Sequence, residues 1–160
     1  MTSKARILLA SLVLAGSGAA LADMKVLTIN VSALPYDLSP SKYDNSPSKY
    51  GNSISNYANS DSNYANSTSN YTNSSSNYAN SRSGANRLIF DNTFVGYYVE
   101  NGAGVTNFFS ASGKRVLYNP EDSSAVFTNT GRYVGALALN SSKSIVLALT
   151  PEGVKALLIR

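Results

Sequence analysis

The feature that most restricts the fold of this chain is a run of heptapeptides across residues 39–86. Each heptapeptide begins with Ser, and the first six have Tyr at the fifth position and Asn at the seventh, as in SISNYAN. The six tyrosines are Tyr43, Tyr50, Tyr57, Tyr64, Tyr71 and Tyr78. A coiled coil needs apolar residues at two positions of every heptad, and here only the tyrosine recurs. The pattern therefore argues against a helix, as does the tendency of Ser and Asn to hydrogen-bond to nearby backbone.

Two conformations of the repeat tract stay open from the sequence. Burial of one tyrosine per repeat gains less free energy than the segment loses in conformational entropy when it becomes ordered. This balance favours a disordered stalk. The alternative is a β-stacked, self-associating segment with Tyr over Tyr and Asn over Asn. The composition of residues 39–86 is similar to the polar repeats of secreted fibre-forming bacterial proteins such as curli subunits. Those repeats are longer and contain glutamine, which is absent here.

Residues 1–22 have the three parts of a secretory signal peptide. Lys4 and Arg6 precede an apolar run at residues 7–15, and a small-residue box, Ala-Leu-Ala, follows at residues 20–22. The apolar run is short for a membrane span. We therefore expect cleavage after Ala22, no membrane span in the mature protein, and an extracytoplasmic location, either periplasmic or secreted.

The rest of the chain divides into three parts by composition. Residues 23–38 hold one short strand and a lead-in, residues 39–86 the repeat tract, and residues 87–160 a β-rich C-terminal domain. The first strand, KVLTINV at 25–31, is expected either to pair with the C-terminal sheet or to fray. Further strands are predicted at 87–91, 94–100, 104–110, 114–118, 124–128, 132–139 and 144–150. Links this short join antiparallel neighbours, which predicts a meander.

Two finer patterns lie inside the C-terminal part. Residues 109–116 and 127–134 repeat one strand, polar turn and strand pattern. At the end of the chain, Thr150 and Pro151 are a typical helix start, and an apolar stripe of Val154, Leu157 and Leu158 should pack on the sheet. The expected fold class is mostly β: a small antiparallel β-meander with a short C-terminal helix, preceded by a repeat tract that is disordered or β-stacked.

The composition excludes several kinds of function. Cysteine and histidine are absent, which removes thiol chemistry, the usual general base and the commonest transition-metal ligands. We expect no metal and no cofactor. Of the 13 Lys and Arg, Lys4 and Arg6 belong to the leader, so the mature chain has 11 against 9 acids, a net charge of +2. With no basic run, this balance argues against nucleic acid as a partner.

The acids and serines of the C-terminal part do not indicate a catalytic centre. Glu121 and Asp122 lie in a predicted turn and Glu152 in the first turn of a helix, where acids commonly serve solubility or the helix dipole. Ser112 and Lys114 fall at a predicted hairpin tip rather than in a cleft, as a Ser/Lys nucleophile would require. We therefore expect that the protein is not an enzyme.

The repeat tyrosines are the best candidates for a functional site. Tyrosine offers a stacking face and a hydroxyl at low entropic cost. We expect an exported, non-enzymatic structural or interaction protein that uses them for surface attachment, matrix formation or self-assembly, with itself or a surface component as partner. The alternative is an extracytoplasmic binding module in which residues 87–160 recognise a protein or polysaccharide and the repeat is a spacer.

Overall fold

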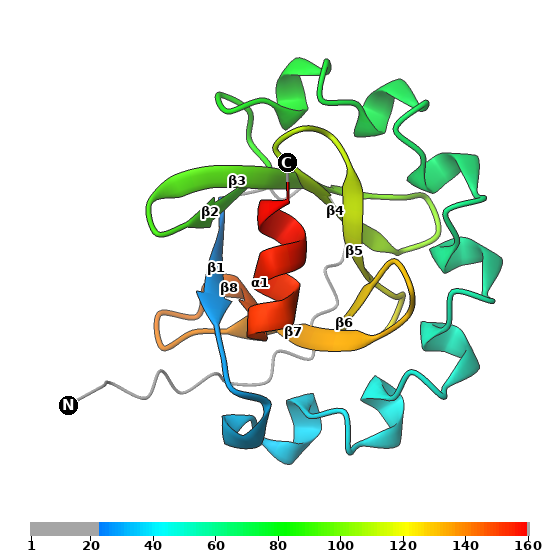
Figure 1. Ribbon diagram of the computed structural model, residues 1–160, viewed down its shortest axis with the longest axis vertical. Helices are drawn as coiled ribbons and strands as arrows, with labels where there is room; N and C mark the ends of the chain where they lie inside the picture. Colours follow the sequence, from blue (N-terminus) through cyan, green and yellow to red (C-terminus); the bar gives the residue numbers. More distant parts are fainter. Residues whose placement is uncertain (1–22, 160) are drawn as a thin grey trace.

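A computed structural model describes residues 23–159 of the chain. The predicted signal peptide, residues 1–22, lies outside the described residues. Within residues 23–159, eight strands form a closed barrel in the order β1 to β8 (Figure 1). Their bounds are Met24–Thr28 (β1), Arg87–Phe90 (β2), Thr93–Glu100 (β3), Thr106–Ser110 (β4), Arg115–Asn119 (β5), Ala125–Thr128 (β6), Tyr133–Leu139 (β7) and Ile145–Leu149 (β8). The mostly β fold with a short C-terminal helix is confirmed.

The first strand closes the barrel. From β2 to β8, each strand is antiparallel to the next, which confirms the predicted meander. β1 is parallel to both of its neighbours, with Lys25 opposite Ile89 of β2 and Val146 of β8. The short N-terminal strand therefore pairs rather than frays, and it occupies the place between the two ends of the meander.

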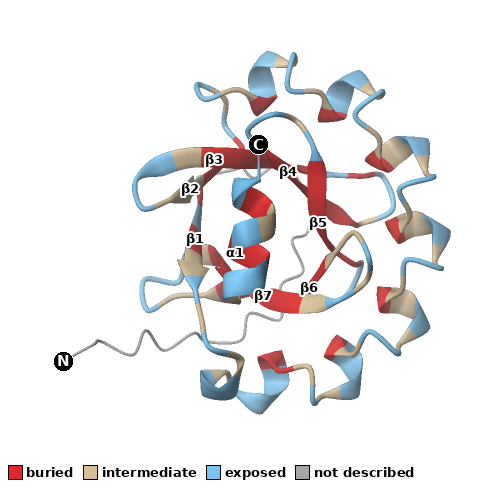
Figure 2. Cartoon of the chain, in the orientation of Figure 1, coloured by how far each residue is buried: buried red, intermediate tan, exposed pale blue. Residues whose placement is uncertain are grey.

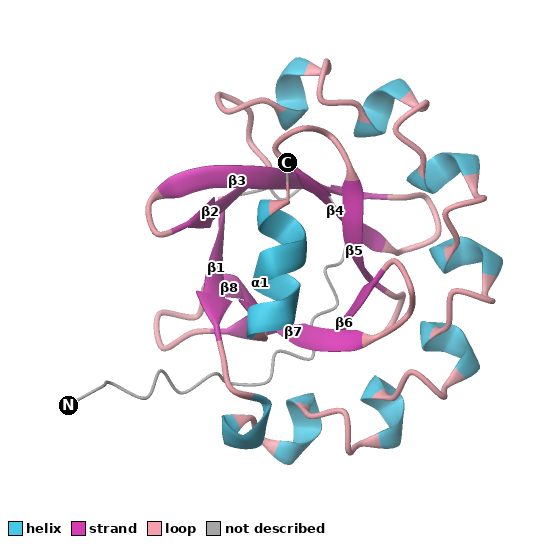
Figure 3. Ribbon diagram, in the orientation of Figure 1, coloured by secondary structure: helices cyan, strands magenta, loops and turns pink. Residues whose placement is uncertain are grey.

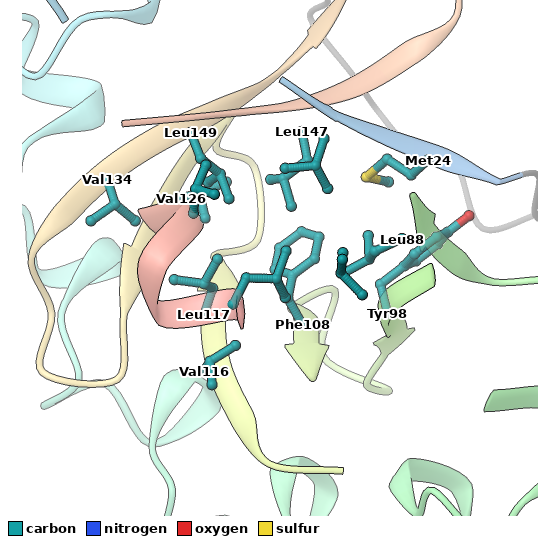
Figure 4. Packing of buried hydrophobic residues seen from close by; sticks show 14 of the residues in the cluster. Met24, Leu88, Tyr98, Phe108, Val116, Leu117, Val126, Val134, Leu147 and Leu149 are labelled. Carbon is teal, nitrogen blue, oxygen red and sulfur yellow. The ribbon is translucent and has the colours of Figure 1, made fainter. Parts of the chain in front are cut away.

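The interior of the barrel is filled by apolar side chains from all around the sheet (Figure 4). Phe108, Leu117 and Leu147 are fully buried there. On the outer face of β7 and β8, Ala136 and Val146 pack instead against Leu38, a residue that precedes the repeats. The outer faces of β7 and β8 are apolar as well as their inner faces. The lead-in segment, rather than the helix, covers these outer faces.

The C-terminal helix α1, Pro151–Leu158, belongs to the interior cluster. The Thr150 hydroxyl accepts a hydrogen bond from the Gly153 N–H, and Pro151 occupies the first turn, as the sequence predicts. Val154 and Leu157 are buried among the barrel's interior residues, whereas Leu158, expected in the same stripe, is 46% exposed. The helix contacts strands on opposite sides of the barrel, including β1, β4 and β5, and it fills the centre of the view in Figure 1. Within residues 23–159, no helix is long and apolar enough to cross a membrane.

The repeat tract is ordered, and this differs from the expected disordered or β-stacked segment. Each of the six tyrosine-bearing repeats forms one short 3-10 turn, and the series curves around the outside of the barrel (Figure 3). The turns are Tyr43–Asn45, Tyr50–Asn52, Tyr57–Asn59, Tyr64–Asn66, Tyr71–Asn73 and Tyr78–Asn80. Two further turns precede them, Val31–Ala33 and Tyr36–Leu38, the second of which matches the repeat spacing. We call residues 31–85 the belt.

Side-chain hydrogen bonds to the backbone explain why the belt is ordered. We number the repeat from its opening Ser (position 1) to its closing Asn (position 7). The position 1 hydroxyl accepts from the N–H of position 3 at 3.0–3.3 Å. The position 7 amide donates to carbonyls of the preceding repeat and of its own repeat at 2.8–3.0 Å. These bonds, rather than burial of tyrosine, offset the entropy that sequence reasoning set against order.

Asparagine at position 4 caps the 3-10 turn in four of the repeats. Its side-chain oxygen accepts from the N–H two residues later at 3.0–3.1 Å. We expect Asn70→Ala, which removes the bond to Thr72, to lower the free energy of unfolding by about 0.5–1 kcal/mol. Lys49 holds position 4 without capping its turn, so Lys49→Ala should lose only an exposed ion pair with Asp44 and change stability less. Urea unfolding of the two variants measures the difference, and equal losses would contradict the cap.

Four hairpins share one turn design. In each hairpin, the backbone of the residue before the turn both donates and accepts a hydrogen bond across the turn. One residue of each turn has a positive φ: Gly104, Gly113, Gly131 or Lys143. In the hairpins at 109–116 and 127–134, Ser110 and Thr128 make matching side-chain contacts at 2.9 and 3.2 Å. The 18-residue repetition in the sequence is therefore a repetition of hairpins.

Lys143 is the one member of this set with a side chain, at a φ of 60°. We expect Lys143→Gly to raise the free energy of unfolding by about 0.5–1 kcal/mol, because glycine adopts this conformation without strain. Gly131→Ala, at a φ of 84° with no neighbour closer than 3.6 Å to the added carbon, should lower it by about 1–2 kcal/mol. Thermal unfolding of both variants tests the pair of opposite signs, and a shift in the same direction would refute it.

Candidate binding surface

The tyrosines of the belt point away from the barrel. Tyr36 and the six predicted site residues are each 62–72% exposed, the six being Tyr43, Tyr50, Tyr57, Tyr64, Tyr71 and Tyr78. Within the same repeats, the position 7 asparagines are only 1–3% exposed, and Figure 2 shows them as a row of buried positions on the inner side of the belt. The structure thus places all the predicted site residues on the outer side of the belt, one repeat apart around the barrel. Tyr36 lies at the same repeat spacing, seven residues before Tyr43, and is not among the predicted site residues.

The tyrosine side chains do not support the belt that carries them. Among the described residues, no hydrogen-bond partner is found for the hydroxyls of these seven tyrosines, and none of their rings stacks on another aromatic ring. In contrast, the recurring Ser at position 1 and Asn at positions 4 and 7 each hold backbone groups. Tyrosine is therefore repeated at a position where the belt itself makes no use of its ring or hydroxyl.

The inner side of the belt is held by polar side chains of the barrel. They reach position 7 of five repeats, or its equivalent Leu38. The bonds run from Tyr133 to the Leu38 carbonyl, Tyr118 to the Asn52 carbonyl, Arg115 to the Asn59 carbonyl, Asn101 and Asn107 to the Asn66 side chain, Tyr97 to the Asn73 carbonyl, and Asn86 to the Asn80 side chain. We call these seven barrel-side residues the anchors. Sequence reasoning missed all of them, because nothing in their local spacing sets them apart from other strand residues.

In four of the repeats, the variable position 2 meets a different neighbour. Asp61 pairs with Arg115 at 2.7 Å, and Arg82 lies 5.8 Å from the centre of the Phe94 ring. Ile54 lies near Gly131, and Ser75 near Gly113, at two of the hairpin tips. The repeats therefore differ where they face different parts of the barrel, while the outward position stays tyrosine.

Arg115 is the charged residue among the seven anchors. It is 6% exposed and donates to the Asn107 side chain, the Asn59 carbonyl and Asp61 at 2.7–2.8 Å. Burial lowers the pKa of its guanidinium, and the hydrogen bond with Asp61 opposes that shift. Its guanidinium also lies 5.2 Å from the centre of the Tyr118 ring. One cation thus joins two strands of the barrel to two repeats of the belt.

The anchor tyrosines make the free energy of unfolding fall at alkaline pH. Burial raises the pKa of Tyr97 and of Tyr118 to about 12, and it raises the pKa of Tyr133 further. Because the folded state holds these protons more tightly than the unfolded chain, stability is intact below about pH 10 and falls as the pH rises from about 10 towards 12. We expect the urea midpoint to drop over this range, and to drop less steeply in a Tyr97→Phe, Tyr118→Phe variant. An identical slope in the variant would contradict the assignment.

The charges of the belt balance. Its three acids and three bases are Asp37, Asp44, Asp61, Lys42, Lys49 and Arg82. Lys42 pairs with Asp37 at 3.2 Å and Lys49 with Asp44 at 3.3 Å, both near the surface, and Asp61 pairs with Arg115. The outer face therefore carries tyrosine, serine and asparagine with no excess of either charge.

The remaining candidates lie apart from this face. An open, mostly apolar hollow of about 430 Å³ lies beside α1, lined by Thr28, Pro151, Val154, Lys155, Leu158 and Ile159. It contains no acid and no nucleophilic pair. Asp91 and Asp122 lie in turns with positive φ, and Glu152 pairs with Arg132 at 3.3 Å. Within residues 23–159, no three acid, His or Cys side chains cluster as a metal site would require.

No family model matches the chain, and no curated protein or solved structure is similar to it at a significant level.

Proposed function

We propose that this protein is exported and non-enzymatic, and that its belt tyrosines attach it to a surface or matrix component or to further copies of itself. One observation supports this above the others. Seven tyrosines recur at one exposed position of an ordered belt, 62–72% exposed, while the other recurring side chains at positions 1, 4 and 7 hold the belt together. A spacer role for the repeat has less support, because the anchors hold the belt against the barrel.

The proposal is tested by replacing the tyrosines as a set. We expect the mature protein to be retained on cell-envelope or matrix material of the source organism, or to form oligomers visible by electron microscopy. The six-fold Tyr→Ala variant, at positions 43, 50, 57, 64, 71 and 78, should do neither. The matched six-fold Tyr→Phe variant keeps the rings and should behave like the wild type. Since the side chains are exposed, all three proteins should unfold at similar temperatures, which controls for folding.

The result that would overturn the proposal is equal behaviour of the Ala variant and the wild type in both assays. Removal of residues 39–86 does not serve as a test, because the belt connects β1 to β2 and its loss would disturb the barrel itself.

A further inference from the structure

The tyrosines are presented in a regular way. Each of the six full repeats has the same 3-10 turn, and the residue before each turn has a φ between −78° and −73°. Each ring is therefore carried on the same local backbone at the same interval along the belt. A partner that uses the whole row must offer the same chemical group at regular intervals. A linear polymer of like units does so, whereas a protein surface without sequence repeats does not.

The surroundings of the tyrosines favour a sugar polymer over a protein. Apart from the tyrosines, Ile54 is the only large apolar side chain that is exposed on the described belt, so the face has no continuous apolar area. The core of a protein interface is usually a contiguous patch depleted in polar residues. A sugar ring has an apolar C–H face and a rim of hydroxyls. It suits an aromatic ring flanked by the serine hydroxyls and asparagine amides of the repeat.

The charge balance selects among polysaccharides. Three acids and three bases on the belt cancel, and Lys42 and Lys49 each have a carboxylate partner. A polyanion would gain little from such a surface, because counterion release and long-range attraction both need unpaired cations. A neutral chain loses nothing by the absence of net charge.

Rigidity makes many weak contacts useful. The anchors and the side-chain bonds of the repeat order the belt before any ligand arrives, so binding does not have to order it. Each stacked ring is worth only about a 2- to 12-fold change in affinity. A row of seven such contacts on one polymer gains by multivalency.

We infer that the outer face of the belt binds a neutral, linear polysaccharide, with sugar rings stacked on successive tyrosines. This inference rests on the proposed function, and it names the chemical class of the surface component.

The test compares polymers that differ in one property. Affinity electrophoresis of the mature protein in gels containing hydroxyethyl cellulose, xylan or glucomannan should show retardation by at least one of these neutral chains. Carboxymethyl cellulose, which has the same backbone as the first but carries negative charge, should retard it no more strongly, even at low salt. Binding of oligosaccharides of the active polymer should strengthen as they lengthen. The six-fold Tyr→Phe variant should keep the retardation, and the six-fold Tyr→Ala variant should lose it.

A graded series adds a quantitative check. Replacing one, two and three adjacent tyrosines, from Tyr57 to Tyr71, by alanine should weaken binding by about 2- to 12-fold at each step. Absence of retardation by all three neutral polymers, or stronger retardation by the charged polymer that persists in the Tyr→Ala variant, would overturn the inference.

The two proposals fail in different ways. If the Tyr→Ala variant loses attachment or assembly while no neutral polymer binds the wild type, the proposed function stands and the polysaccharide inference is wrong. If the Tyr→Ala variant attaches and assembles like the wild type, both are wrong.

Discussion

Deletion of one heptapeptide, residues 67–73, is expected to lower the free energy of unfolding by about 4–8 kcal/mol, which is most of the stability of a small domain. β1 and β2 are neighbours in the sheet, yet the chain between them passes around the outside of β7, β5, β4 and β3. The anchors meet the belt at Leu38 and at five of the repeats along this path, so the number of repeats is matched to the circumference of the barrel.

A belt shortened by one repeat cannot satisfy all of its contacts. Either Tyr97 and Asn86 lose the partners that they now have in Asn73 and Asn80, or β1 is pulled from its place between β2 and β8. Each buried donor left without an acceptor costs about 1–3 kcal/mol, and loss of β1 opens the barrel. Chemical denaturation gives the magnitude, and hydrogen exchange of the amides in β1 shows which of the two outcomes occurs.

The matched control keeps the length and changes the sequence. Thr68→Ser with Thr72→Ala converts the same heptapeptide into the sequence of the next one, SSSNYAN. No side-chain hydrogen bond of Thr68 or Thr72 is found among the described residues, and Thr72 bonds only through its backbone N–H and carbonyl. The double variant should therefore stay within about 0.5 kcal/mol of the wild type. A deletion variant that is as stable as this control would show that the belt is not in register with the barrel.

Replacement of Arg115 by leucine is expected to lower the free energy of unfolding by about 3–5 kcal/mol. Leucine fills part of the space but leaves the Asn107 side-chain oxygen and the Asn59 carbonyl, both buried, without their donors. The contact with the Tyr118 ring is lost as well. Urea unfolding of the variant measures the total effect, and protection of amides in repeats 53–66 should fall more than protection in β8.

Two substitutions separate the roles of charge and geometry at this anchor. Asp61→Asn keeps an acceptor for Arg115 at a site that is 61% exposed, so its cost should be about 1 kcal/mol or less. Arg115→Lys keeps the charge but cannot make three divergent bonds, and it should fall between the wild type and the leucine variant. A leucine variant that loses less than the Asp61→Asn variant would remove Arg115 from the anchors.

The barrel was largely predictable from sequence, and the belt was not. Strands such as β3 and β7 carry their signal in short apolar and aromatic runs between turn residues, so their limits are found within one or two residues. Thr150 and Pro151 predict the start of the helix. What local patterns do not give is closure, because the pairing of Lys25 with Val146 joins residues at opposite ends of the chain.

The belt was misjudged for a specific physical reason. Ser and Asn at high density are typical of disorder, and the sequence alone suggests order only through burial of tyrosine or through β-stacking of Tyr and Asn between repeats. In the structure, Asn66 is 1% exposed and makes four side-chain hydrogen bonds, two to its own belt and two from Asn101 and Asn107. Such bonds depend on the barrel, which no heptapeptide can reveal alone. That the tyrosines are site residues stays a prediction, and their regular exposure along the belt follows from the ordered 3-10 turns.

The pairing of β1 with β8 also constrains when this protein can acquire its final shape. Its contacts span almost the whole described chain, and folds rich in such distant contacts form slowly. A polypeptide still emerging from a ribosome lacks β8 until that strand has been synthesised, so the sheet stays open at one side until then. Closure of the barrel is therefore a late event in the folding of this protein.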